Sequence, residues 1–142
     1  MKAIRVSETW QRAAVYYIRI NVLVKGQGIP LEMEFDKADG EKAKYILLLD
    51  NKTPIATARL NIIDEQTAKI ERVCVAKEYQ SQGFGRELIK ATEEWAKEYG
   101  AKKIIITSQV KARGFYESLN YQVNPNIQIE STIPIVYTEK NL

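Results

Sequence analysis

Short apolar runs separated by polar turn residues fill the middle of the chain, and in the segments on either side apolar residues recur three or four positions apart. Short aliphatic and β-branched runs bounded by turn residues predict strands, whereas a spacing of three or four predicts amphipathic helices. The expected strands cover residues 2–6, 45–50, 54–63, 67–76 and 103–107, with two more around residue 121 and over 133–138. The expected helices cover residues 7–22, 31–35, 86–99 and 112–119. This order predicts a single α/β (α+β) domain over residues 1–142, with a mixed, mostly antiparallel sheet of about six to seven strands flanked by helices.

The helix over residues 86–99 has the clearest pattern. Leu88, Trp95 and Tyr99 fall on one face, and Gly100 supplies the residue type that adopts the left-handed conformation at a helix end. Trp10 has the same spacing from apolar neighbours in the first helix. We therefore expect Trp10, Trp95 and Tyr99 to pack in the core rather than to bind a ligand.

The composition is that of an ordinary globular domain. Hydrophobic residues make up 45% and charged residues 27% of the 142 residues, and no apolar run is long enough for a membrane span or a signal peptide. The net charge of +3 comes from lysines scattered among glutamates, which gives little support for a nucleic-acid partner. These features predict a cytoplasmic protein that binds neither membrane nor nucleic acid.

Cysteine and histidine usage restricts the chemistry. Cys74 is the single cysteine and the chain has no histidine, so an internal disulfide and the usual zinc ligands are excluded, and no metal is expected. Schemes that pair a serine or cysteine nucleophile with histidine are excluded as well. Without an evident activating partner, Cys74 is expected to be a small packing residue. Catalysis would have to use carboxylates, tyrosines, lysines, water or backbone amides.

A glycine-containing turn joins the expected strand 67–76 to the helix 86–99. Gly83 and Gly85 remove side chains that would keep a ligand away from the backbone, and Arg86 adds a positive charge. The unpaired amides of the first helical turn favour an anion, and the helix dipole adds about 0.3–1 kcal/mol at an exposed site. Two glycines taken alone would more often mean a tight strand-to-helix connection. With this strand and helix around it, the turn is a candidate diphosphate site.

The flanking residues resemble a known motif. Residues 73–89 resemble the acetyl-CoA motif of the GNAT superfamily of N-acetyltransferases, with Gln80-x-x-Gly83-x-Gly85 in the place of Arg/Gln-x-x-Gly-x-Gly/Ala. An apolar strand precedes the motif and an amphipathic helix follows it, as in that superfamily. The resemblance implies that acetyl-CoA is a co-substrate and that its diphosphate binds at this turn.

A second segment supports the same family. Residues 109–121 resemble the later A-x-x-F-Y-x-x-x-G-F segment of the superfamily, with Asn120 at the usual glycine, and asparagine tolerates a left-handed turn. Residues 27–36 more faintly resemble the ElaA-like branch. Gly26 and Ile135 stand where an acid and a histidine are expected in that branch, so no role is carried over from those two positions.

The resemblance implies a divergent pair of strands. Strand 67–76 would separate from strand 103–107 so that the pantetheine arm pairs with its backbone like an added strand, and an amide there could serve the oxyanion. The cofactor-binding residues implied in this way are Val73, Cys74, Val75, Gln80, Ser81, Gln82, Gly83, Phe84, Gly85, Arg86, Gln109, Ala112, Phe115 and Tyr116.

Tyr116 matches the general acid of the superfamily. A phenol with a pKa of about 10 suits protonation of a thiolate leaving group, although a core aromatic residue is the alternative. For the base that accepts the proton of the amine, the candidates are Glu71 on the motif strand, Glu78 beyond it, or a water molecule. The expected reaction is transfer of an acetyl group to a primary amine by direct attack on the thioester.

The acceptor is not identified by the sequence. Glu32, Glu34 and Asp36 could attract a cationic amine or form a solvated loop. The partner is expected to be a small-molecule or peptide amine, and a homodimer remains open. Two other functions compete: a CoA or acyl-CoA binding module without turnover, and, with much weaker support, a nucleic-acid module.

Overall fold

The computed structural model describes residues 1–142, which form one α/β domain around a seven-stranded sheet of order β1-β2-β3-β4-β5-β7-β6. All neighbouring strands are antiparallel except β4 and β5. The strands are β1 (Lys2–Arg5), β2 (Lys44–Asp50), β3 (Thr53–Ile62), β4 (Thr67–Val75), β5 (Lys103–Gln109), β6 (Gln122–Val123) and β7 (Ile135–Asn141). The helical segments are α1 (Thr9–Arg19), η1 (Ile20–Lys25), α2 (Leu31–Glu34), η2 (Lys37–Asp39), η3 (Lys77–Tyr79), α3 (Phe84–Glu98), η4 (Val110–Ala112) and α4 (Arg113–Ser118). The predicted fold class is confirmed, and no helix is both long and apolar enough to cross a membrane.

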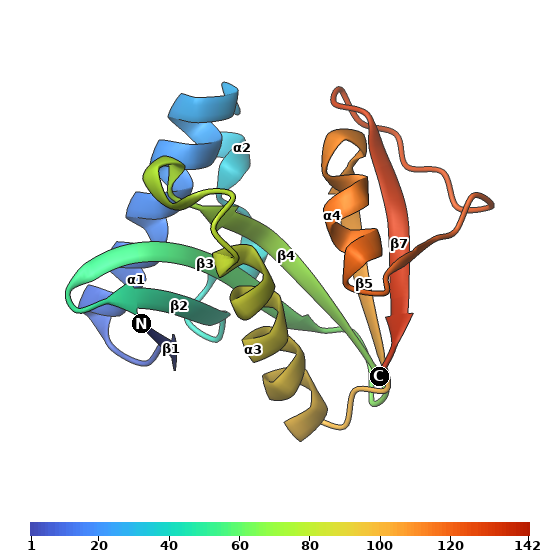
Figure 1. The fold of residues 1–142 in the computed structure, drawn as a ribbon, viewed down its shortest axis with the longest axis horizontal. Helices are drawn as coiled ribbons and strands as arrows, with labels where there is room; N and C mark the ends of the chain where they lie inside the picture. The colour runs from blue at the N-terminus through green and yellow to red at the C-terminus, as the bar shows by residue number, and fades with distance from the viewer.

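The sheet opens between β4 and β5. These strands pair only where residues 67–69 face residues 103–105, and beyond that point β5 continues along β7 while β4 continues along β3. Figure 1 shows the green β4 and the orange β5 meeting at one end and diverging toward the other. The predicted divergence is therefore confirmed.

A β-bulge accompanies this divergence. Thr57 pairs with Cys74 and Arg59 with Glu71, so one residue of β3 faces two residues of β4. Arg72 lies in this bulge with φ +53°, a conformation that costs a residue other than glycine about 1–2 kcal/mol. An extra residue bends the strand that contains it, so the bulge explains why β4 leaves β5 at this point.

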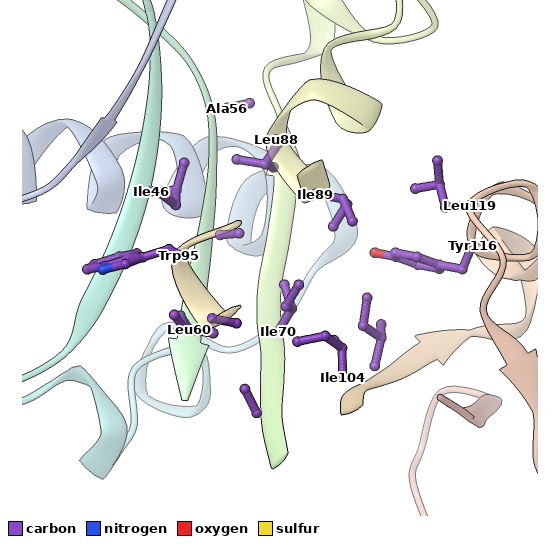
Figure 2. Packing of buried hydrophobic residues seen from close by; sticks show 14 of the residues in the cluster. Ile46, Ala56, Leu60, Ile70, Leu88, Ile89, Trp95, Ile104, Tyr116 and Leu119 are labelled. Atoms are coloured by element: carbon purple, nitrogen blue, oxygen red, sulfur yellow. The ribbon is translucent and has the colours of Figure 1, made fainter. Parts of the chain in front are cut away.

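Helices cover both faces of the sheet. The sheet has a hydrophobic core on each face, and alternate residues of β2 point into different cores. Ile46 and Leu48 pack on the α3 side, and Leu47 and Leu49 pack on the α1 side. Figure 2 shows Leu88, Ile89 and Trp95 of α3 packed among residues of the sheet. This alternation places α1 and α3 on opposite faces.

The expectation that Trp10 and Tyr99 pack in the core is wrong. Trp10 is 54% exposed and Tyr99 is 48% exposed, whereas Trp95 is buried as predicted. The buried face of α1 is instead formed by Gln11, Val15, Ile18 and Arg19. Helical spacing alone does not identify the inward face of α1. Arg19 points inward because it forms ion pairs with Glu34 and Asp39. Tyr99 follows the last turn of α3, where its ring lies 6.3 Å from that of Trp95 between centroids and 5.2 Å from Nζ of Lys44.

Candidate functional site

The turn between β4 and α3 presents a row of free backbone donors. The amides of residues 81–86 donate to no acceptor in the protein, and the first amide of α3 with a backbone partner is that of Glu87. Gly83 has φ +91°, and no atom lies within 4 Å of the position that a Cβ would occupy. Ser81 has φ +63°. The alternation of ordinary and left-handed residues turns successive amides toward one concave surface, which is the arrangement that binds phosphate oxygens.

Two glutamines hold this turn in shape. The side-chain amide of Gln80 donates to the carbonyl of Val75 at 2.9 Å, and that of Gln82 donates to the carbonyl of Glu78 at 2.9 Å. Both bonds connect the turn to the end of β4 or the segment after it. Gln80 and Gln82 therefore shape the anion site through their side chains, while the backbone provides the donors.

Gly85 serves a different purpose from Gly83. A Cβ at position 85 would lie 3.0 Å from Cζ of Phe115, so the absence of a side chain allows α4 to approach the start of α3. The Phe115 ring is 38% exposed and packs against Tyr116 with a centroid distance of 5.0 Å. The two GNAT-like segments thus meet in space at Gly85 and Phe115.

Replacing Gly85 by alanine should lower stability and disturb the anion site together. The added methyl group would push the Phe115 ring aside, and crowding of this kind costs about 1–3 kcal/mol. Urea unfolding should report the loss, and Phe115→Leu in the same chain should restore most of it by removing the ring atom in contact. Equal stability of Gly85→Ala and the native chain would show that the contact is unimportant.

The opening between β4 and β5 forms a cleft of about 380 Å³. Ala76 N–H donates to Ile55 of β3 at 2.7 Å and Cys74 pairs with Thr57, so by strand alternation the backbone groups of Val73 and Val75 point toward the cleft. The Gln80 bond to the Val75 carbonyl agrees with this direction. The free edge of β4 can therefore pair with an extended ligand arm.

Cys74 takes no part in the cleft. Its side chain packs in the core on the α1 side, and burial raises the pKa of the Cys74 thiol to about 12. Of the three β4 residues expected to bind the cofactor, the structure brings Val73 to the cleft wall and presents the backbone of Val75, while the Cys74 backbone faces β3. The expectation that Cys74 is a packing residue is confirmed.

Tyr116 reaches the cleft from α4. Its side chain is only 7% exposed, yet it lines the cleft, and its hydroxyl makes no hydrogen bond within the protein, unlike the hydroxyls of Tyr16, Tyr45 and Tyr121. Figure 2 shows the ring extending from α4 toward α3 and β4 with the hydroxyl oxygen at the leading end. Burial is the main cause that raises the pKa of Tyr116 well above its usual value, and the nearby Cys74 side chain adds a smaller effect in the same direction. Tyr116 therefore stays protonated at neutral pH and keeps a proton available to a group in the cleft.

The remaining predicted residues surround the cleft and the turn. Ala112 and Gln109 line the cleft, and the Gln109 side-chain amide donates to Oε1 of Gln27 at 2.7 Å, which joins the two sides of the cleft. Arg86 is exposed and has no ion pair. Its charge is available to a ligand at the turn.

Glu71 lines the cleft, whereas Glu78 does not. Arg59 donates to Oε1 of Glu71 at 3.2 and 3.3 Å, and Lys69 lies 3.5 Å from Oε2. Both oxygens of Glu71 thus have a cationic partner. Its position suits a base in the cleft, and the cations hold the carboxylate in place.

The acidic segment before β2 is neither a free anionic surface nor a solvated loop. Arg19 and Glu34, both almost completely buried, are 2.8 Å apart, and Arg72 contacts Glu34 at 3.3 Å. Asp36 contacts Arg59 at 2.9 Å and Arg72 at 3.2 Å. We call the ion-paired set the charge network; its members are Arg19, Glu34, Asp36, Asp39, Arg59, Lys69, Glu71 and Arg72. Only Glu32 of the three predicted acids is exposed and free.

The charge network was not predicted. Its four carboxylates and four cations come from α1, α2, η2, β3 and β4 and balance each other. The sequence signal that could have revealed it is the arginine at position 59 in the centre of an apolar strand, since a buried arginine requires carboxylate partners. The network also holds Arg72 in its left-handed conformation and so supports the bulge that opens the cleft.

Acid should weaken the fold through this network. Burial alone would raise the pKa of Asp39, but hydrogen bonds from Arg19 and Tyr45 outweigh it and hold that pKa well below its usual range. The pKa of Asp36 is lowered as well, because bonds from Arg59 and Ala38 outweigh burial. A carboxyl group whose pKa is lower in the folded chain than in the unfolded chain stabilises the fold when it is ionised. This stabilisation is complete above the pKa of the unfolded chain, about 4, and is lost as the pH falls toward the pKa of the folded chain. The free energy of unfolding should therefore decline below about pH 4.

The matched variant is Asp39→Asn. It keeps the size of the side chain but leaves buried Arg19 with one carboxylate fewer, which should cost about 3 kcal/mol at neutral pH. Urea unfolding measured between pH 3 and pH 7, about the range in which carboxylates titrate, should show a shallower acid decline than in the native chain. An unchanged decline would mean that Asp39 does not contribute to it.

Comparison with known proteins agrees with this geometry. Residues 6–121 match the Acetyltransferase (GNAT) family. The chain belongs to the GNAT acetyltransferase family. It is 34% identical over 123 residues to the uncharacterised N-acetyltransferase YjcF of Bacillus subtilis, covering 87% of this chain and 86% of the relative.

Solved structures give the same result for the fold of this GNAT chain. A Lactobacillus plantarum protein proposed to be an N-acetyltransferase superposes with a TM-score of 0.92 and 34% identity, covering 99% of this chain and 97% of that one. Escherichia coli ElaA superposes with a TM-score of 0.84 and 21% identity, covering 99% of both chains. The predicted family membership is confirmed, and GNAT enzymes use acetyl-CoA.

Proposed function

We propose that this GNAT protein transfers the acetyl group of acetyl-CoA to the nitrogen of a primary amine, with Tyr116 as general acid. The observation that carries the proposal is that the free amides of residues 81–86, the open edge of β4 and the Tyr116 hydroxyl, which makes no hydrogen bond within the protein, lie around one divergence of the sheet. In acetyl-CoA, the diphosphate would bind the free amides, the pantetheine arm would pair with the edge of β4, and the sulfur leaving group would lie near the Tyr116 hydroxyl. The residues present therefore fit acetyl-CoA.

Each group of the chain has a defined part in this proposal. The amides of residues 81–86 and Arg86 hold the diphosphate, and the backbone of Val73 and Val75 pairs with the pantetheine arm. Phe84 and Phe115 lie beside these donors, where Gly85 allows α4 to approach. The backbone amide of Val73 is the candidate donor to the carbonyl oxygen of the thioester.

The chemistry requires two proton transfers. As the amine nitrogen bonds to the acetyl carbon, the C–S bond of the thioester breaks and Tyr116 donates its phenolic proton to the sulfur. The amine loses a proton to Glu71, either directly or through a water molecule. Glu71 suits this part better than Glu78 because only Glu71 lines the cleft.

Calorimetric titration with acetyl-CoA, CoA and ATP tests the cofactor site, and thiol release from acetyl-CoA in the presence of amines tests turnover. We expect both CoA forms to bind tightly and ATP weakly, because ATP lacks the arm that pairs with β4. Failure of CoA to bind would refute the proposal. Binding of CoA without thiol release for any amine would favour a CoA-binding module instead.

A further inference from the structure

A second cavity adjoins the cleft and has a different electrostatic character. It has a volume of about 830 Å³ and lies among α1, η1, the start of β3 and the segment that follows β4. Gln27 and Lys111 line both this cavity and the cleft. We call it the mouth cavity, because a molecule within it is in direct reach of the cleft.

Unpaired lysines surround the mouth cavity. Lys52 precedes β3, Lys77 begins η3 and Lys111 lies in η4, so the three come from separate parts of the chain. None of them lies within 4.0 Å of a carboxylate oxygen. Glu78 is the one carboxylate that lines the cavity, and it is also without an ion pair. Three lysines against one glutamate give the cavity a positive potential.

The cleft itself offers no compensating negative charge. Its two carboxylates, Glu34 and Glu71, belong to the charge network and are neutralised by arginines and Lys69. A substrate that carries several positive charges would meet lysines at the mouth and no free acid in the cleft. A substrate with an anionic group would meet three free cations on its way to the same place.

We propose that the acceptor is a primary amine that also carries a carboxylate or phosphate group, and that Lys52, Lys77 and Lys111 bind this anion while the amine enters the cleft. This inference rests on the proposed acetyl transfer and adds the class of acceptor. The apolar part of the cleft wall, which includes Leu23, Ile29 and Ile133, then accommodates the segment between the amine and the anion.

The donors proposed for the cofactor phosphates are not the lysines of the mouth cavity. The amides of residues 81–86 and Arg86 lie in the turn before α3 and in its first residues, and none of these residues lines the mouth cavity, although Gln80 at the beginning of the turn does. The mouth cavity is lined instead by Tyr17, Ile18 and Asn21 from the opposite face of the sheet, where α1 packs. Figure 1 shows α3 and α1 separated by the strands β2 and β3. The two anion sites therefore adjoin at Gln80 but use different donors, which are backbone amides in the turn and lysine side chains in the mouth cavity.

Matched pairs of amines test the acceptor class. Thiol release would be compared for tyrosine and tyramine, and for phosphoethanolamine and ethanolamine, with spermidine as a polycation. The kcat/KM of the anionic member should exceed that of its partner by about tenfold or more, and the advantage should shrink as salt is added. Calorimetric binding of the same amines to the CoA-loaded protein should show the same order without depending on turnover. The pair with the larger advantage distinguishes carboxylate from phosphate.

Lysine variants locate the anion site. Lys52→Ala, Lys77→Ala and Lys111→Ala combined should raise KM for the anionic amine by about tenfold and leave kcat and the affinity for acetyl-CoA nearly unchanged. Lys90→Ala, which removes an exposed lysine of α3, should change none of these values.

Three outcomes would overturn the inference. Cationic amines could be preferred to their anionic partners, or the two members of each pair could bind equally. The triple variant could weaken acetyl-CoA binding and leave the acceptor preference intact, which would assign the lysines to the cofactor. Absence of CoA binding by the native chain is a different result, because it would refute the acetyltransferase proposal itself.

Discussion

Replacement of Tyr116 by phenylalanine should lower kcat by about a hundredfold or more and leave the affinity for acetyl-CoA nearly unchanged. The variant removes only the hydroxyl, which makes no hydrogen bond within the protein, so the buried ring keeps its packing against Phe115 and Tyr121. The loss should therefore fall on proton donation to the leaving sulfur. Steady-state thiol release and calorimetric binding of acetyl-CoA measure the two quantities separately.

Tyr121→Phe is the matched control. Tyr121 is also buried and lies 6.0 Å from Tyr116 between ring centroids, but its hydroxyl donates to Glu93 at 2.6 Å in the core. Removal of this bond to a carboxylate should cost about 1.5–3 kcal/mol of stability with little effect on kcat. Equal activity of Tyr116→Phe and the native chain would remove Tyr116 from the mechanism.

The pH profile gives an independent check on Tyr116. Because burial raises the pKa of Tyr116 above its usual value of about 10, the acid form persists through the neutral and moderately alkaline range. Native kcat/KM should then rise with pH as the amine loses its proton, without a fall below about pH 10. A fall near pH 8, about two units below the usual tyrosine pKa, would indicate a different acid.

Replacement of Gly83 by glutamate should weaken binding of acetyl-CoA by about a hundredfold or more. A residue with a side chain is strained at φ +91°, which costs about 1–2 kcal/mol. The new carboxylate would also compete for the free amides of residues 81–86 and repel a diphosphate. Calorimetric titration with CoA and acetyl-CoA measures the effect, and both ligands should lose affinity equally because both carry the diphosphate.

Gly40→Glu controls for the added charge. Gly40 has an ordinary φ of −67°, and a Cβ there would make normal contact at 3.6 Å with Lys37. It lies outside the turn between β4 and α3, so affinity for CoA should be preserved. Unchanged binding in Gly83→Glu would place the diphosphate elsewhere.

Local sequence was sufficient wherever a short segment sets its own structure. The turn around Gly83 combines a left-handed glycine with the end of a strand and the start of a helix, and all three signals lie within a few residues. Asn120 was likewise expected to tolerate a left-handed turn, and it has φ +73°. The meander of β2, β3 and β4 follows from short apolar and β-branched runs between polar turns, and no strand end differs from its predicted position by more than one residue.

Local sequence signals did not identify which face of α1 points inward. Two apolar stripes share that helix, and the stripe with Trp10 and Tyr17 is exposed while the one with Val15 and Ile18 is buried. The choice depends on Arg19, whose partners Glu34 and Asp39 follow 15 and 20 positions later. A charged group can be buried only if its partners are brought to it, and that depends on how α2 and η2 fold back over the sheet.

The sequence by itself determined the family of this protein, the shape of the turn proposed to bind phosphate and the choice of Tyr116 as the candidate acid, because each is encoded by neighbouring residues. Only the tertiary structure decided which charges near the cleft remain free. The acids before β2 looked available to a cationic amine in the sequence, but the fold pairs them with arginines and leaves the lysines of the mouth cavity unpaired. Electrostatic character depends on distances between residues far apart in the chain, and those distances exist only once the chain has folded.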